Sequence, residues 1–183
     1  LMQADWRCIA YDHRGSVAST APPQDVGPLG LVRDLFVTPD HFGVSTCVLA
    51  GESMGALTVL AAALEQPDRF AGLVIVDGVC ETSGIPQDRS AVRDHYADYV
   101  TGFVNACVPE PDSERIKRWG RQILMRADPE AAARMFESHD TPRLAPDLSQ
   151  VTVPTLVIHG ERDAIVPLEL GVATAKAIPH AQF

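Results

Sequence analysis

The sequence predicts an α/β protein with a mostly parallel sheet flanked by helices. Near-continuous apolar runs at residues 46–51, 72–78 and 154–160 indicate strands buried on both faces, which is typical of parallel sheets. Residues 53–67, rich in alanine and leucine, lie between the first two runs and end at a proline, so we expect a buried helix there. A strand, a helix and a strand in this order form the crossover unit of α/β proteins.

Two further strands are expected near the ends of the chain. A short mixed apolar run at residues 7–12 predicts a strand that the sequence His-Arg-Gly ends. The apolar run at residues 154–160 is followed by a predicted helix at residues 168–178, which contains the glycine at position 171. After it, Gln182 and the final residue are predicted to begin another strand. Because the chain starts without methionine and stops there, we expect it to be part of a longer protein.

Residues 81–152 have a different pattern, in which apolar side chains recur at helical spacing. Asp128 followed by Pro129 predicts the start of a helix, with the aspartate as N-cap and the proline in the first turn. We predict three amphipathic helices in this segment, inserted between two strands. The predicted division is a core formed by residues 1–80 and 153–183, with residues 81–152 as a helical lid.

The charge balance argues against two classes of partner. The chain has 15 Lys and Arg residues against 24 Asp and Glu residues, a formal net charge of −9, whereas nucleic acids and anionic membranes attract basic surfaces. No apolar run approaches the roughly 18 residues of a membrane span. We therefore expect no nucleic-acid and no membrane partner. The four cysteines form no C-x-x-C pair, and a cytoplasmic location is expected.

Ser53 lies in the sequence Gly-Glu-Ser-Met-Gly, between an apolar run and a helix-forming segment. A strand, a sharp turn and a helix, in that order, are what a nucleophile elbow requires. The flanking glycines avoid clashes within the turn, and a strained serine backbone exposes the hydroxyl above the sheet. The backbone N–H of Met54 is then expected to point to where an oxyanion develops. The alternative is a tight strand-to-helix turn with an idle serine.

Four segments together resemble the α/β-hydrolase superfamily, and specifically its lid-bearing serine hydrolases. YDHRGSVAS resembles the loop after the family's fourth strand, and GESMG the elbow after the fifth. GLVIVDG resembles the sixth strand, and PTLVIHGERDAIVP the seventh with its acid-bearing turn. The similarity covers nearly the whole chain except the lid. It implies an incomplete α/β-hydrolase fold that lacks the N-terminal strands and the loop carrying the catalytic histidine.

Two positions depart from the family's usual pattern. Val17 stands where the R-G-x-G turn usually has its second glycine, so that loop must be shaped differently. Ala56 replaces a glycine that often follows the elbow. Alanine is small enough for the helix to pack closely on the sheet.

Asp163 is the candidate triad acid, because the resemblance places the acid in the Gly-x-x-Asp turn after the last apolar run. Its expected role is to hold the imidazole in the correct tautomer and to stabilise the imidazolium. The alternative for Asp163 is an N-cap of the following helix. Asp77 is the alternative acid, since some relatives carry it after the sixth strand.

The histidine base is not evident among the six histidines. Five of them precede Asp163, against the family's chain order of Ser, acid and His: His13, His41, His95, His139 and His159. For His159, at the end of a strand, packing or solvent contact is expected. His180 follows Asp163, but it precedes the strand that begins at Gln182, whereas the family's histidine follows that strand. We expect the base beyond Phe183.

The resemblance also places the third strand and the second oxyanion donor before Leu1. Residues 7–12 would then lack a neighbour beside residues 46–51, and the exposed strand edges are expected to promote association.

A complete site of this kind transfers an acyl group to water. Ser53 attacks the carbonyl, the histidine acts as base and then acid, and Asp163 orients it. Carboxylic esters, lactones, thioesters and related C–C bonds fit as substrates, and no metal or organic cofactor is implied. Aromatic lid residues either line an apolar substrate pocket or pack the lid onto the core: Tyr96, Tyr99, Phe103, Trp119 and Phe136. The alternative function is a non-catalytic small-molecule binding protein of the same fold.

Overall fold

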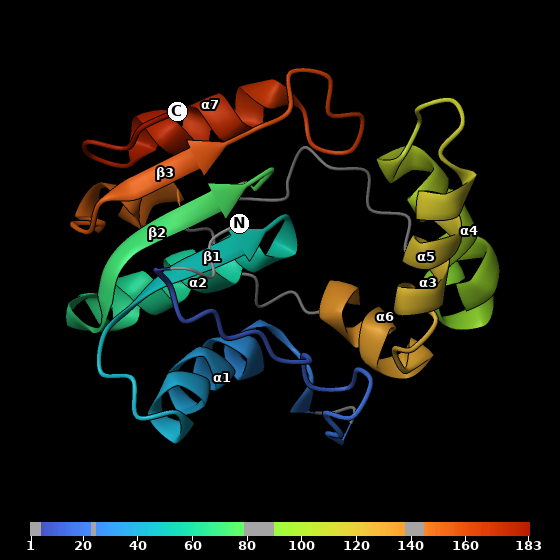
Figure 1. Cartoon of the computed structure of the whole chain (residues 1–183), viewed down its shortest axis with the longest axis horizontal. Coiled ribbons are helices and arrows are strands. Elements are labelled where there is room, and N and C mark those ends of the chain that lie inside the picture. The colour runs from blue at the N-terminus through green and yellow to red at the C-terminus, as the bar shows by residue number, and fades with distance from the viewer. Residues whose placement is uncertain (1–4, 23–24, 79–89, 138–144) are drawn as a thin grey trace.

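A computed structural model describes residues 5–22, 25–78, 90–137 and 145–183 of the chain. Within these ranges a parallel sheet of three strands runs in the order β1 (Cys47–Glu52), β2 (Phe70–Val76) and β3 (Thr155–Ile158) (Figure 1). This arrangement confirms the predicted α/β class and the parallel strands. Because the strands are parallel, their carboxyl ends meet at one edge of the sheet, and the candidate site residues follow them there.

Helices connect and cover the strands. α2 (Met54–Glu65) and the 3₁₀ helix η2 (Pro67–Arg69) lead from β1 to β2, as the crossover unit predicts. α1 (Pro28–His41) packs against α2, and α7 (Leu168–Ala177) packs against β3. The core joins these layers through apolar side chains such as Leu60 of α2, Leu73 of β2 and Val157 of β3, all nearly inaccessible to solvent.

The sheet is covered less completely than the sequence predicts. β1 and β3 alternate between buried and more exposed positions, although their sequences are continuously apolar. Val48, Leu156 and Ile158 are partly exposed, whereas Leu49 and Val157 are buried in the core beside α2. The prediction that these strands are buried on both faces is therefore wrong for the described residues.

Residues 7–12 do not form the predicted strand. This segment pairs with no strand of the described sheet, and its Cys8 is exposed. A strand needs a neighbour to satisfy its backbone groups, and none of the described strands pairs with this segment. Its Arg7 side chain lies over the Phe42 ring. At the other end the prediction is confirmed: the Gln182 N–H donates to the Thr155 carbonyl at 2.9 Å, in an isolated parallel bridge beside β3.

Four helices lie to one side of the sheet (Figure 1): α3 (Ser90–Asp94), α4 (Tyr96–Cys107), α5 (Glu114–Leu124) and α6 (Pro129–Glu137). They pack against one another in the pairs α3–α4, α4–α5 and α3–α6. The sequence predicts three helices, and the difference is a break at His95, whose backbone leaves the helical region at φ −137°. The Asp128 carboxylate accepts the Ala131 N–H at 2.9 Å, which confirms the predicted N-cap.

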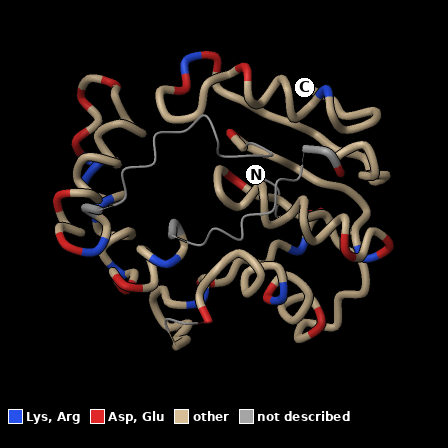
Figure 2. The backbone as a smooth tube through the Cα atoms, turned by 180° about the vertical axis from the view of Figure 1, so that it is seen from behind, with Lys and Arg blue, Asp and Glu red and all other residues tan. Residues whose placement is uncertain are grey.

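The chain returns to the sheet through the 3₁₀ helix η3 (Ala145–Gln150). Acidic and basic positions are interspersed along the helices and loops around the sheet (Figure 2). In the described part of the chain, no helix combines the length and the apolar character needed to cross a bilayer. The division into a core and a lid at residues 81–152 stays a prediction.

Candidate functional site

Ser53 occupies the turn between β1 and α2 in a strained conformation. Its backbone angles are φ 49° and ψ −116°, in a region that residues other than glycine rarely adopt. Such a conformation costs about 1–3 kcal/mol and persists where the surrounding structure enforces it. Here the Ser53 N–H donates to the Val76 carbonyl at 2.9 Å, and the Ser53 carbonyl accepts the Ala56 N–H at 3.0 Å. The turn is therefore fixed to β2 on one side and to α2 on the other.

Close backbone contacts explain one of the two elbow glycines. A Cβ at Gly51 would lie 2.4 Å from the Gly55 carbonyl oxygen, so no other residue fits there. A Cβ at Gly55 would meet nothing within 4 Å, so the expectation that this glycine avoids a clash is wrong. Ala56 is fully buried, and a Cβ at Gly78 would lie 2.1 Å from its methyl group. The alanine thus permits close packing, with a glycine opposite it.

Met54 is the first residue of α2. The first N–H groups of a helix have no acceptor within the helix and carry the positive end of its dipole. The Met54 N–H is therefore one of these groups, and it directly follows Ser53. Its donation to an oxyanion that forms on attack by Ser53 stays a prediction.

The Asp163 carboxylate fixes the loop that follows β3. Its Oδ1 accepts the N–H groups of Ile165 at 2.7 Å and of Val166 at 2.9 Å. The Asp163 N–H donates to the Gly160 carbonyl at 3.2 Å. Oδ1 takes both amides, whereas Oδ2 lies 3.8 Å from Nε2 of His159. α7 starts later, after Pro167, and has no side-chain cap, so the alternative of Asp163 as its N-cap is wrong.

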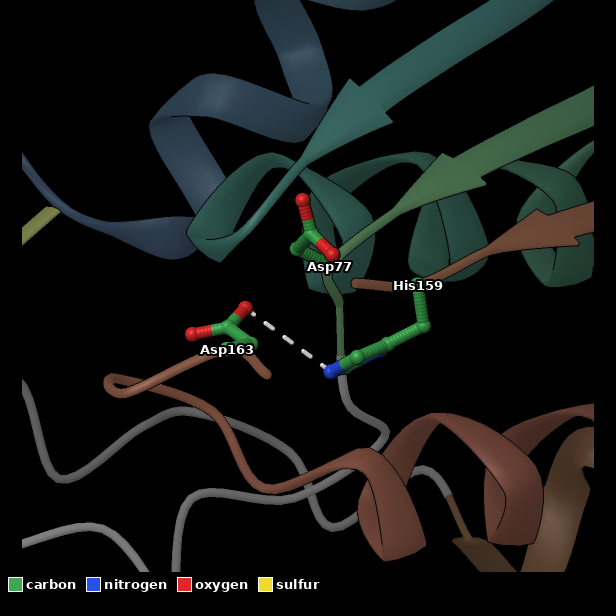
Figure 3. Close-up of side chains that lie close together, drawn as sticks. All are labelled: Asp77, His159 and Asp163. Carbon is green, nitrogen blue, oxygen red and sulfur yellow. Dashed lines mark ion pairs between the residues drawn. The ribbon is translucent and has the colours of Figure 1, made fainter. Parts of the chain in front are cut away.

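Asp77 also has a strained backbone, at φ 46°. Its N–H donates to the Ile158 carbonyl at 2.9 Å, and its Oδ1 accepts the Gly160 N–H at 2.8 Å. Asp77 thus joins the ends of β2 and β3. The two candidate acids lie near each other, with His159 beside them (Figure 3).

A third carboxylate completes this acidic region. Glu52, directly before the nucleophile candidate, is partly exposed, yet burial of part of its side chain raises its pKa. The negative charges of Asp77 and Asp163 raise this pKa further. Sequence reasoning did not single out Glu52, although its place next to Ser53 on the carboxyl end of β1 was visible.

His159 is the residue whose role the sequence analysis underestimated. Its side chain is completely buried, which confirms the expected packing. Its Nε2 lies 2.9 Å from the Val166 carbonyl and 3.8 Å from Asp163 Oδ2. A carbonyl can only accept, so Nε2 carries the proton. Nδ1 is buried with no hydrogen-bond partner. The signal in the sequence was Gly171 inside a helix, because a Cβ there would lie 2.2 Å from this Nδ1.

Asp77, His159 and Asp163 offer polar atoms within 4.8 Å of one another, a spacing compatible with a metal ion. Each of the three already serves the protein's own hydrogen bonds: Asp77 to Gly160, Asp163 to the next loop amides, and His159 to Val166. These hydrogen bonds explain why the polar atoms of the three side chains lie close together.

The aromatic lid candidates are dispersed over their helices. The Tyr96 hydroxyl donates to the Leu124 carbonyl at 2.9 Å and so joins α4 to α5. Tyr99 and Phe103 stack at a centroid distance of 6.1 Å. Trp119 is 64% exposed, and the side chain of Phe136 lies outside the described residues.

Cys107, at the end of α4, is a residue that the sequence analysis missed. Burial raises the pKa of its thiol, and the charges of Glu52 and Asp163 raise it further. Its spacing of four residues from Phe103 places both side chains on one face of the helix.

The other histidines lie elsewhere. His13 stacks on Tyr11 and has a pKa lowered by burial, and His95 immediately precedes α4. His180 is exposed, with φ 63°, in the turn before Gln182. His139 lies outside the described residues.

A family model described as serine aminopeptidase, S33, matches residues 1–183. Among curated proteins, the chain is 26% identical over 181 residues to Karrikin insensitive 2 receptor B of Petunia hybrida, covering 90% of this chain and 66% of the receptor. It is 28% identical over 199 residues to the putative carbamate hydrolase RutD of Azorhizobium caulinodans, covering 100% and 73%. The chain thus spans about two-thirds of the first of these relatives.

The fold is also similar to that of a thermophilic esterase from Thermogutta terrifontis. The TM-score is 0.78 at 28% identity, over 94% of this chain and 68% of the esterase.

Proposed function

Because the chain belongs to the serine aminopeptidase S33 family of the α/β-hydrolase superfamily, we propose that it carries the nucleophile and the acid of a serine hydrolase. The observation that carries this proposal is the strained backbone of Ser53 at φ 49°, held between β1 and α2. Strain of this kind is retained where it serves a function. An ordinary N-cap serine has no such strain and binds a helix N–H through its side chain, which Ser53 does not do.

In the proposed mechanism the Ser53 hydroxyl attacks a carbonyl carbon, and the Met54 N–H donates to the developing oxyanion. Asp163 Oδ2 orients the imidazole of the general base, while Oδ1 stays bound to Ile165 and Val166. The base takes the proton of the Ser53 hydroxyl and gives it to the leaving group. It then takes a proton from water, which attacks the acyl group, and returns that proton to the Ser53 oxygen as the acid product leaves. We assign the base to a histidine outside the six of the chain, because five of them precede Asp163 and His180 precedes the strand that begins at Gln182.

The proposed substrates are carboxylic esters, lactones, thioesters or related compounds with a hydrolysable C–C bond. The similarity to an esterase and to a putative carbamate hydrolase supports hydrolysis at a carbonyl carbon. Tyr99 and Phe103 of α4, stacked in line with Cys107, are the proposed lid-side contacts of an apolar acyl group. The proposed location is the cytoplasm, where the free thiols of the three described cysteines would stay reduced.

The test is covalent labelling with a fluorophosphonate, which reacts with activated serines. We expect one adduct, located on Ser53 by peptide mass spectrometry, and no adduct in the Ser53→Ala variant. A panel of aryl esters, lactones and thioesters of increasing acyl length then defines the substrate. An adduct on another serine, or ester hydrolysis that survives Ser53→Ala, would overturn the assignment.

The similarity to a plant receptor favours a second candidate, a small-molecule binding protein in which the elbow contributes to the ligand pocket. The two functions differ in what Ser53→Ala does. A binding protein would show ligand-induced thermal stabilisation with both wild type and Ser53→Ala, and no turnover with either. Lactones are suitable probes because they serve both as ligands and as substrates.

A further inference from the structure

We infer that His159 is a positioning residue that holds the triad acid in place by clamping the acid loop, defined as residues 160–167. This inference rests on the proposed function, since it takes Asp163 as the acid. His159 contacts neither Ser53 nor, in this role, the substrate. It acts through the backbone of the loop.

The clamp is a hydrogen bond across the loop. The Nε2–H of His159 donates to the Val166 carbonyl at 2.9 Å, and the Val166 N–H donates to Asp163 Oδ1 at 2.9 Å. The backbone of Val166 thus connects the His159 imidazole to the Asp163 carboxylate. The Ile165 N–H adds a bond of 2.7 Å to the same oxygen. Release of Val166 would therefore remove one of the two amides that hold the Asp163 carboxylate and weaken its orientation.

The imidazole has a space built for it. Its side chain is 0% exposed, and its ring packs where a Cβ at Gly171 would lie 2.2 Å from Nδ1 and 2.8 Å from Cγ. Gly171 is itself buried within α7, where glycine weakens a helix relative to alanine. α7 thus has a residue of low helix propensity at the position where the His159 ring packs against it.

The unpartnered Nδ1 argues against simple packing. With the proton on Nε2, Nδ1 is a buried acceptor without a donor, which is costly in an apolar interior. An apolar side chain would fill this space without that cost. Histidine is the better residue only because its Nε2–H binds the loop.

The consequence concerns the direction of Asp163 Oδ2. A carboxylate must point at the imidazole of the base within a few tenths of an ångström, and a displacement of about 1 Å can reduce the rate about 100-fold. Loosening of the acid loop should therefore lower kcat and leave KM nearly unchanged.

The test compares three variants in the longer protein that supplies the proposed histidine base, because kcat and KM require a complete site. His159→Phe keeps a flat ring and removes the donor, whereas His159→Gln keeps an N–H that can reach Val166. Thr174→Val is the matched control, because it removes a buried hydrogen bond of α7 to Leu170 without touching the acid loop. The measurements are amide hydrogen exchange at residues 165 and 166, the ¹⁵N spectrum of the His159 ring, and kcat and KM for an ester substrate.

We expect His159→Phe to speed exchange at both amides at least about tenfold and to lower kcat at least about tenfold. His159→Gln should recover part of both effects, and Thr174→Val should change neither. The ring spectrum of the wild type should show protonated Nε2 and unprotonated Nδ1.

An unprotonated Nε2 in the wild type, or unchanged exchange in both His159 variants, would overturn the clamp. Faster exchange with unchanged kcat in an active enzyme would overturn the positioning role while leaving the hydrolase assignment intact. Activity that survives Ser53→Ala would instead overturn the hydrolase assignment, and the exchange data would still test the clamp.

Discussion

The Asp77 carboxylate accepts a hydrogen bond of 2.8 Å from the Gly160 N–H, so one candidate acid supports the loop that carries the other. Asp163 accepts two loop amides through Oδ1. This asymmetry assigns different tasks to the two carboxylates. Asp77 secures the start of the acid loop, and Asp163 keeps Oδ2, which lies 3.8 Å from His159 Nε2, as the oxygen proposed to face the base.

We expect Asp163→Asn to lower kcat about 10³- to 10⁴-fold, because a neutral amide neither fixes the imidazole tautomer nor stabilises the imidazolium. Its carbonyl oxygen can still accept the two loop amides, so the fold should be retained. Asp77→Asn also keeps its bond to Gly160 and should lower kcat less than about tenfold. Steady-state kinetics of both variants provide the measurement, and a larger loss from Asp77→Asn would identify Asp77 as the acid.

Replacement of Ser53 should separate strain from chemistry. Glycine adopts φ 49° without a Cβ penalty, whereas alanine does not. We expect Ser53→Gly to be more stable than Ser53→Ala by about 1 kcal/mol, and both to be inactive. Urea denaturation of the pair measures this difference. Equal stabilities would show that the turn relaxes when the hydroxyl is removed, and that Ser53 is not held under strain.

Features encoded by local chemistry were predictable from the sequence. The order of strand, glycine-flanked serine and helix is contained in about twenty consecutive residues, and the structure has that order from Cys47 to Glu65. The N-cap at Asp128 is equally local. In each case the residues that define the feature are close together in the sequence.

Features that depend on distant partners were not predictable. Residues 7–12 have a strand-like sequence but find no neighbour among the described strands. The contact of His159 with Gly171 joins residues on two elements, and sequence patterns reveal the glycine but not what occupies the space above it. The influence of Glu52 and Asp163 on the pKa of the Cys107 thiol likewise joins residues that are far apart in the sequence.

Two glycines in helix interiors offer a matched test of packing. A Cβ at Gly102 of α4 would meet nothing within 4 Å, so Gly102→Ala should stabilise the protein by about 0.5–1 kcal/mol through helix propensity. Gly171→Ala gains the same propensity but forces a methyl group into the His159 ring, and should destabilise by about 1–3 kcal/mol. Denaturant unfolding of both variants checks the contrast. A stabilising Gly171→Ala would mean that the ring is not seated as described.

The raised pKa of Glu52 predicts a pH-dependent loss of stability. Its carboxyl is harder to ionise in the folded chain than in the unfolded chain, because of burial and the charges of Asp77 and Asp163. The folded state therefore holds more protons, and stability should fall as pH rises from the ordinary glutamate value, about 4.3, through the raised one. The loss should persist at neutral pH. It should be modest, since part of the side chain is exposed and solvent screens the charges.

Glu52→Gln removes this ionisation, so we expect higher stability than wild type at pH 7 and a difference that shrinks toward pH 4. Thermal unfolding across this pH range provides the measurement. Glu161→Gln is the control, because Glu161 is an exposed acid on the acid loop and its removal changes the net charge equally. A gain of the same size in both variants would reflect net charge alone. A gain confined to Glu52→Gln would show that burial of the Glu52 carboxylate, together with the charges of Asp77 and Asp163, destabilises the folded state.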